Sequence, residues 1–388
     1  MTESISKEIL EDLVQLRKTL HRYPELSGNE RQTAGWVKAF LEKQRPDRII
    51  EKIGGHGLAA IFDSGQEGPT ILFRADLDAL PIQEANEFDY KSQHEGVSHK
   101  CGHDGHTAIL AGVAAVLGRE RPERGRVVLL FQGEEETGQG AEKVIKDPLF
   151  QEILPDQVYA LHNLPGYPEK TIVVKDGPFA SASKGMIIEL TGRSSHAAHP
   201  EQGNSPGLIL PELIGGLQGI PAESSAFRDF VLLTIIHVKL GELAFGTNPG
   251  KGVVMATLRS FLNDDMKVFT RRAESLVKTL ADRNGLEASI RYTEVFPATH
   301  NQIGATDTVR KAAGANGARV LDIEDPFRWS EDFGHFTQQF PGALFGIGSG
   351  EKHPSLHNND YDFPDEIIET GIAMFLEIAR LASNKEDD

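Results

Sequence analysis

The chain has 388 residues, a length that predicts two domains and leaves room for a third. Its 57 acidic and 40 basic side chains give a formal net charge of −17, which disfavours binding to nucleic acid or to anionic membranes. The single cysteine, Cys101, excludes an internal disulfide and fits a reducing compartment. The first residues form no apolar leader, and the stretch 108–117 is too short to cross a bilayer. We therefore expect a soluble, cytoplasmic protein.

The first half of the chain reads as alternating helices and strands. Apolar residues at helical spacing predict helices over 5–21 and 30–43. Further along, apolar runs predict strands at 58–62, 70–73, 126–131 and 158–161, with a helix at 105–118. This alternation favours an α/β fold, a mixed and mostly parallel sheet flanked by helices.

From about Ser181 the pattern changes to longer strands. These are predicted at 185–190, 229–239, 252–261 and 287–293, with a helix at 264–283. Two helices on a mostly antiparallel four-stranded sheet would account for 182–293 as an inserted α+β domain. The α/β pattern then resumes, with helices near 306–315, opening at 330–332 and over 364–382, and a strand at 343–347. The predicted division is 1–181 with 294–388, and 182–293 inserted.

Residue types that bind metals follow several of the predicted strands. They are Asp76 and Asp78, the run Glu134 to Glu136, His162, the pair Cys101 and His103 just before a helix, and a late His357. Alone, the acidic run is typical of a solvated turn, and the Cys-His pair of an ordinary loop. Because parallel strands end at one crevice, these groups are expected to converge. Thiolate, imidazole and carboxylate ligands suit zinc first, with manganese, cobalt or nickel as alternatives, and favour a pair of ions.

Eight sequence blocks give this pattern a family resemblance. They are LRKTLHRYPELSGNE (16–30), RADLDALPIQE (74–84), HKCGHDGHTAIL (99–110), FQGEEETGQGA (131–141), LHNLPG (161–166), GRSSHAAHPEQGNSP (192–206), SEDF (330–333) and LHNNDYDF (356–363). In this order they resemble the dinuclear-metal amidohydrolases, which include bacterial N-acyl-amino-acid aminoacylases, hippurate hydrolases and plant auxin-conjugate hydrolases. The resemblance implies a zinc-exopeptidase-like catalytic domain with an inserted ferredoxin-like domain that serves as lid and dimerisation domain.

The resemblance also implies roles for individual residues. The metal ligands would be Cys101, His103, Glu136, His162 and His357, with the Cys101 thiolate bridging two divalent ions. Glu135 would be the general base, and Asp78 would orient a ligand from outside the metal sphere. Glu134 occupies a position that is usually small in relatives, so a one-residue ambiguity remains in this run. The role of Asp76 stays open, because other branches place a histidine ligand there.

In the resembling family, the histidine matching His196 reaches across a dimer interface to support the developing oxyanion. We therefore expect a homodimer formed through the inserted domain. The alternative is a turn histidine on the surface of that domain. A departure from the family lies nearby, since Gly246 stands where relatives commonly carry an asparagine. Asn248 would replace that amide after a shift in register.

Substrate recognition has its own candidates. Arg259, in a Thr-Leu-Arg motif, would clamp a substrate carboxylate through its fork, or pair with an acidic surface group. Gly348 and Ser349, just after a predicted strand, would offer backbone N–H groups to a carboxylate, or form a plain tight turn.

The residues and the resemblance together predict a metal-dependent amidohydrolase. Its substrates would be small molecules, N-acyl or N-aroyl amino acids or small dipeptides, from which it releases a free amino acid. One alternative keeps the metal site but cleaves another C–N bond, in an aryl amine or a carbamoyl compound. A second is a dimeric metal-binding protein without activity. Retention of the base Glu135 beside every ligand type argues against the second.

Overall fold

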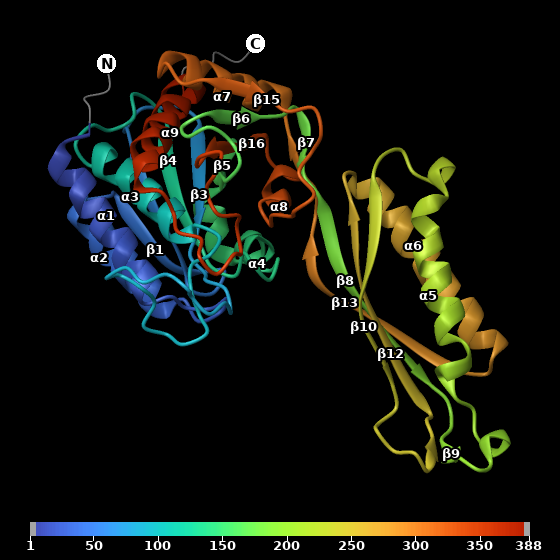
Figure 1. Ribbon diagram of the computed structural model, residues 1–388. Helices are drawn as coiled ribbons and strands as arrows, with labels where there is room; N and C mark the ends of the chain where they lie inside the picture. The colour runs from blue at the N-terminus through green and yellow to red at the C-terminus, as the bar shows by residue number, and fades with distance from the viewer. Residues whose placement is uncertain (1–4, 384–388) are drawn as a thin grey trace. The chain divides into compact units, whose positions relative to one another are not determined.

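The computed structural model describes residues 5–383, which form two compact units (Figure 1). The first unit comprises the chain up to Phe179, Thr299–Pro326 and the chain from Glu331. The second comprises Ala180–Ala298 and Phe327–Ser330, and the predicted inserted domain, 182–293, falls inside it. None of the helices in the described part of the chain combines the length and apolar character needed to span a membrane.

The first unit is built on an eight-stranded mixed sheet in the order β1-β2-β4-β3-β5-β16-β6-β15. The strands are β1 (Arg48–Ile53), β2 (Gly57–Asp63), β3 (Thr70–Asp76), β4 (Arg126–Gln132), β5 (Gln157–Leu164), β6 (Ile172–Val174), β15 (Val320–Asp322) and β16 (Gly342–Gly348). The four central strands β4, β3, β5 and β16 run parallel. Their apolar runs are buried on both faces, as a covered parallel sheet requires. The predicted largely parallel sheet is therefore confirmed.

Helices cover this sheet (Figure 1). They are α1 (Lys7–Arg22), α2 (Arg31–Lys43), α3 (His103–Leu117), α4 (Gly140–Lys146), α7 (Ile303–Ala315), α8 (Gly334–Thr337) and α9 (Ile368–Ser383). One hydrophobic core joins α1, α2, α3, α7 and α9 to one face of the strands. α3 is buried almost along its whole length and begins after Gly102, whose φ is 102°. A Cβ at Gly102 would also lie 2.5 Å from the side chain of Asn163, so a larger residue does not fit there.

The second unit contains a four-stranded antiparallel sheet in the order β10-β12-β8-β13. Its elements are β8 (Ala182–Thr191), α5 (Leu210–Gly219), β10 (Val231–Leu240), β12 (Lys251–Ser260), α6 (Asn263–Arg283) and β13 (Glu287–Phe296). The βαββαβ order is ferredoxin-like. Both helices pack against the sheet in a second hydrophobic core.

Small elements complete the two units. The strands are β7 (Gly177–Ala180), which pairs with β14 (Thr299–Asn301), and β9 (Ser195–His196), which pairs with β11 (Thr247–Asn248). The 3-10 helices are η1 (Pro148–Ile153), η2 (Pro200–Gln202), η3 (Pro206–Leu208), η4 (Ile220–Ala222), η5 (Ser224–Ala226) and η6 (Asp365–Ile367).

The segment 327–330, which we call the strap, belongs to the second unit although the chain on either side belongs to the first. Ser181 donates to the carbonyl of Phe327 through both its N–H and its hydroxyl. Arg259 donates to the carbonyl of Arg328 at 2.8 Å and to Ser330 Oγ at 3.0 Å. These hydrogen bonds join the strap to Ser181 and Arg259 of the second unit.

The helix predicted to open at 330–332 is wrong as placed. α8 begins only at Gly334 and lasts one turn. The physical reason is that Glu331 and Asp332 turn their side chains toward the buried guanidinium of Arg74, at 2.9 and 2.6 Å, instead of starting a helix.

Candidate metal centre

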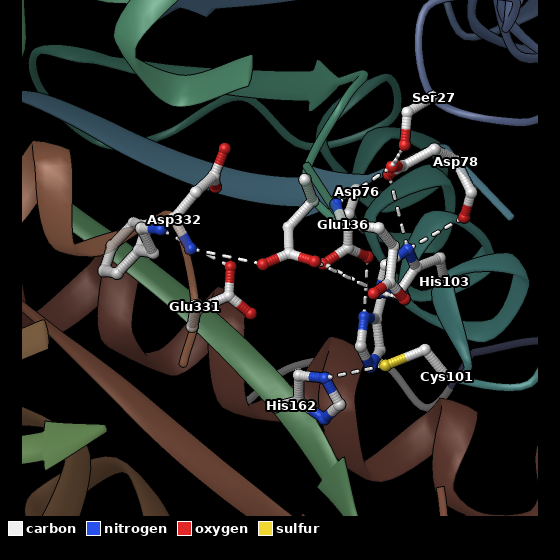
Figure 2. Close-up of polar contacts among 12 residues, drawn as sticks. Ser27, Asp76, Asp78, Cys101, His103, Glu136, His162, Glu331 and Asp332 are labelled. Carbon is white, nitrogen blue, oxygen red and sulfur yellow. Dashed lines mark hydrogen bonds and ion pairs between the residues drawn. The ribbon is translucent and has the colours of Figure 1, made fainter. Parts of the chain in front are cut away.

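The five predicted metal ligands come together at the carboxyl ends of the central strands. Figure 2 shows Cys101, His103, Glu136 and His162 among them. Cys101 and His103 lie at the start of α3, Glu136 follows β4, His162 is in β5, and His357 follows β16. Two groups of donor atoms fall within 4.8 Å of one another, Cys101 with His103 and His162, and Cys101 with Glu136 and His357. Cys101 is common to both groups, which is the placement that a bridging thiolate requires.

The unpaired donors in this cluster test whether a metal fits. Nε2 of His103 and Oε1 of Glu136 are buried and have no hydrogen-bond partner among the described residues, yet lie 3.7 Å apart. His103 Nδ1 donates to the carbonyl of Asp78 at 2.9 Å, which leaves the lone pair on Nε2. Buried polar atoms are rarely left unpaired. A cation between these two atoms satisfies both, so the residues fit a metal such as zinc.

Asp78 accepts hydrogen bonds from two of the candidate ligands, His103 and Glu136. Its carbonyl accepts from His103, and its Oδ2 accepts from Ser27 Oγ at 2.6 Å and from the N–H of Glu136 at 3.0 Å (Figure 2). The bond from His103 fixes the tautomer of its imidazole ring. The bond from the N–H of Glu136 fixes the backbone that carries the Glu136 side chain. Such support orients metal ligands in proteins.

The three consecutive glutamates have different surroundings. Glu134 has a φ of 59° and pairs with Lys143 at 2.6 Å, away from the candidate ligands. Glu135 is buried, with Oε1 accepting from the N–H of Asp332 at 3.2 Å and Oε2 3.9 Å from Nε2 of His103. Glu135 and Glu136 therefore face the ligand groups, and Glu134 does not.

Charge and burial act strongly on these carboxyl groups. Burial, together with the carboxylates of Glu331 and Glu136, raises the pKa of Glu135 well above its usual range. Burial, with a further contribution from Asp78, raises the pKa of Glu136 to about 7 although His103 opposes the shift. Bound cations reverse this balance, because they stabilise the charged carboxylates.

His357 is the most exposed of the candidate ligands. Its side chain is about half exposed, with Nε2 3.8 Å from Oε1 of Glu136. Its backbone has a φ of 66°, and its N–H donates to the carbonyl of Lys100 at 2.7 Å. That bond ties the loop after β16 to the residue before Cys101.

Sequence reasoning missed a buried network beside the ligands. Asp76, whose role was open, accepts from Arg74 at 2.8 Å and contacts Nδ1 of His106 at 2.7 Å. Nε2 of His106 lies 2.5 Å from Oδ1 of Asn163. Asp76 also groups with His103 and His106 as possible metal donors, but both nitrogens of His106 are already paired. The sequence signal for this network was Arg74 itself. A charged side chain inside an apolar strand is buried, and it therefore needs buried partners of opposite charge.

The predicted backbone site at Gly348 and Ser349 is wrong. The N–H of Gly348 donates to Thr171 at 2.8 Å, and that of Ser349 donates to Leu164 at 3.0 Å. Neither N–H is available to a substrate carboxylate, because each already donates to a backbone carbonyl group of a neighbouring segment. The hydroxyl of Ser349 is buried and has no partner within the described part of the chain.

Three predicted site residues lie in the second unit. His196 is exposed in β9, and its Nδ1 accepts from the N–H of Ala198 at 3.0 Å. Asn248 in β11 pairs in register with Ser195 and donates to Ser195 Oγ at 3.1 Å. Arg259 donates to the strap, so its observed contacts are a carbonyl and a hydroxyl, not an acidic surface group.

Known proteins are similar to this chain over most of its length. A sequence model of peptidase family M20/M25/M40 matches residues 72–381. An N-acetyl-L-cysteine deacetylase of Bacillus subtilis is 32% identical over 97% of this chain and 89% of its own length. A hippurate hydrolase of Campylobacter jejuni is 31% identical over 94% of each chain.

Solved structures share the fold across nearly the whole chain. A dinuclear-metal-binding peptidase of the M20 family from Bacillus subtilis is 25% identical, with a TM-score of 0.83 over 98% of this chain and 100% of its own. An aminohydrolase described as putative, from methicillin-resistant Staphylococcus aureus, is 23% identical, with a TM-score of 0.88 over 97% and 98%. The chain belongs to peptidase family M20/M25/M40 and is a hydrolase.

Proposed function

We propose that this hydrolase cleaves the amide bond of N-acyl or N-aroyl amino acids, or of small dipeptide-like substrates, and releases a free amino acid. The observation that carries the proposal is the position of Glu135, whose Oε2 faces the same donor cluster as His103 and Glu136. Two relatives, the deacetylase of N-acetyl-L-cysteine and the hippurate hydrolase, support N-acyl and N-aroyl amino acids as the substrate class.

In this proposal, two divalent ions would be held by the candidate ligands. These are Cys101, His103, Glu136, His162 and His357, and Cys101 belongs to both donor groups described above. Zinc is our first choice, with manganese, cobalt or nickel as alternatives. When bound, such ions acidify a water molecule and polarise the scissile carbonyl.

The protein's own groups then move the proton. Glu135 accepts a proton from the attacking water through its free oxygen, Oε2, while Oε1 stays anchored to the N–H of Asp332. The same carboxyl group returns that proton to the leaving nitrogen. Asp78 keeps His103 and Glu136 oriented throughout, through the three hydrogen bonds described above.

The proposal includes a homodimer in which His196 of each copy supports the oxyanion in the other. β10 lies at an edge of the second unit's sheet and exposes Ile236, Val238 and Leu240. An apolar, unpaired edge strand is a surface on which a second copy can pair. Asn248 holds Ser195, the residue before His196, so its proposed role is to brace that strand. Arg259 remains the proposed contact for the substrate carboxylate.

A substrate screen tests the proposal. The metal-reconstituted protein is assayed for release of amino acid from acetyl-, benzoyl- and longer-chain acyl amino acids, with N-carbamoyl amino acids and aryl amines as comparison arms. We expect turnover of the acyl or aroyl compounds that is lost after chelation and restored by added metal. Turnover restricted to the carbamoyl or aryl amine arm would assign a different C–N bond. Unchanged hydrolysis without metal would overturn the mechanism. Cys101 must stay reduced for this role, which supports a cytoplasmic setting.

A further inference from the structure

Arg74 is a buried cation for which the proposed mechanism has no use. It lies in β3 with only 1% of its side chain exposed. Its guanidinium donates to Oε1 of Gln132 at 3.1 Å and to Oδ2 of Asp76 at 2.8 Å. A third nitrogen binds Oδ1 of Asp332 at 2.6 Å and lies 2.9 Å from Oε1 of Glu331. Every nitrogen of the fork is thus engaged inside the protein.

Asp332 is the partner that links Arg74 to the candidate base. Besides Arg74, its carboxylate accepts from Nε2 of Gln132 and from the N–H of Ala141, both at 2.8 Å. Three donors therefore fix this side chain, and with it the backbone nitrogen of the same residue. That nitrogen donates to Oε1 of Glu135 at 3.2 Å.

Charge makes this arrangement depend on Arg74. Oxygens of Glu135, Glu331 and Asp332 lie within 4.8 Å of one another, and all three residues are buried. Like charges at this distance repel strongly in a medium of low dielectric constant. Arg74 pairs directly with two of the three, so removing its charge would drive Glu331 and Asp332 apart from Glu135. A metal ion at these three carboxylates is disfavoured, because the guanidinium already binds two of them.

We propose that Arg74 is a positioning residue: it fixes Asp332 so that the N–H of Asp332 holds one oxygen of Glu135 and leaves the other directed at the ligand cluster. The inference rests on the proposed function, because it presupposes Glu135 as the base. Lysine cannot reproduce the effect, since one ammonium group lacks the planar fork that reaches Asp76, Gln132 and Asp332 together.

The test is the variant Arg74→Lys. We expect kcat to fall about 10²-fold, the size of effect that a misplaced catalytic group produces, with KM and metal content nearly unchanged. A crystal structure of the variant should show Glu135 Oε1 separated from the nitrogen of Asp332. A double-mutant cycle with Glu135→Gln should be strongly non-additive, because Arg74→Lys has little left to disturb once the base is gone.

Arg17→Lys is the matched control. Arg17 is equally buried and contacts Asp104, Asp362 and Asp365, none of which contacts Glu135. In the double variant, the fold-loss of kcat from Arg17→Lys should simply multiply with the fold-loss from Glu135→Gln. If Arg74→Lys does not fold, Gln132→Met removes one of the three bonds to the Asp332 carboxylate and should give a smaller, equally non-additive loss.

Two results would overturn the inference. One is an unchanged kcat in both Arg74→Lys and Gln132→Met. The other is a loss of kcat in these variants that simply multiplies with the loss from Glu135→Gln in the double variants. These results differ from failure of the proposed function, in which Glu135→Gln itself would retain normal turnover.

Discussion

Nε2 of His103 and Oε1 of Glu136 face each other at 3.7 Å, buried and without a hydrogen-bond partner in the part of the chain that the structure describes. Because a cation resolves this unpaired contact, metal binding should stabilise the fold as well as supply chemistry. We expect thermal unfolding to shift to higher temperature on adding zinc to chelator-treated protein, with two ions bound per chain. Glu136→Gln should weaken both effects. A melting temperature that does not respond to metal would contradict the assignment.

The two neighbouring glutamates provide a matched pair of variants. Glu135→Gln should lower kcat by about 10²- to 10⁴-fold, the usual contribution of a general base, with metal content preserved. Glu134→Gln, one residue earlier, removes only an ion pair with Lys143 and should keep nearly normal kcat. Steady-state kinetics on both variants decides the one-residue ambiguity of this acidic run. The opposite pattern would move the base to Glu134.

Mixing subunits tests the shared active site. His196→Ala and Glu135→Gln proteins, each strongly impaired alone, should regain activity when unfolded together and refolded, because a mixed dimer holds one intact pair of residues. Analytical ultracentrifugation before and after mixing checks that dimers form. Mixed dimers without recovered activity would show that each copy completes its own site, and a monomer would remove the proposed role of β10.

Stability should depend on pH through His21, a buried residue of α1. Burial alone would lower its pKa, but hydrogen bonds to Asp104 at 2.9 Å and Glu84 at 2.8 Å raise the pKa to about 9. A pKa raised above the ordinary value of 6.5 means that the protonated form is favoured by folding. Its stabilisation is fully present below about pH 6.5 and is lost as the pH rises through 9.

The size of this effect follows from the shift, on the order of 3 kcal/mol. Urea unfolding of wild type and His21→Gln at several pH values measures it, and the difference should shrink between pH 6.5 and 9. His56→Gln, in a turn of intermediate exposure, serves as the control. A difference independent of pH would mean that His21 is neutral in the fold.

Much of the fold follows from local patterns in the sequence. The central strands were predictable because both of their faces are buried, which gives unbroken apolar runs such as Ile71 to Phe73. β6 and β15 were missed because three residues carry too little pattern. The helix expected at 330–332 was misplaced because its acidic residues serve a partner, Arg74, more than 250 residues earlier in the chain.

The candidate ligands were also predictable, since metal-binding residue types recur in compact motifs after strands. The tertiary contacts around these ligands were not predictable. The N–H groups of Gly348 and Ser349 are taken by Thr171 and Leu164, and nothing near 348 in the sequence signals this. The brace from Arg74 through Asp332 to Glu135 likewise joins three distant segments. Local motifs therefore indicate which atoms can bind metal, whereas tertiary contacts decide which other groups remain free.

The strap has a consequence for engineering. A designer who removed the second unit by joining Phe179 to Thr299 would leave residues 327–330 in place without Ser181 and Arg259, their hydrogen-bond partners. The orphaned strap leads directly into Glu331 and Asp332, whose positions the candidate base depends on. The second unit therefore cannot simply be deleted. A shortened version of this hydrolase that lacks the second unit would also need a redesigned strap.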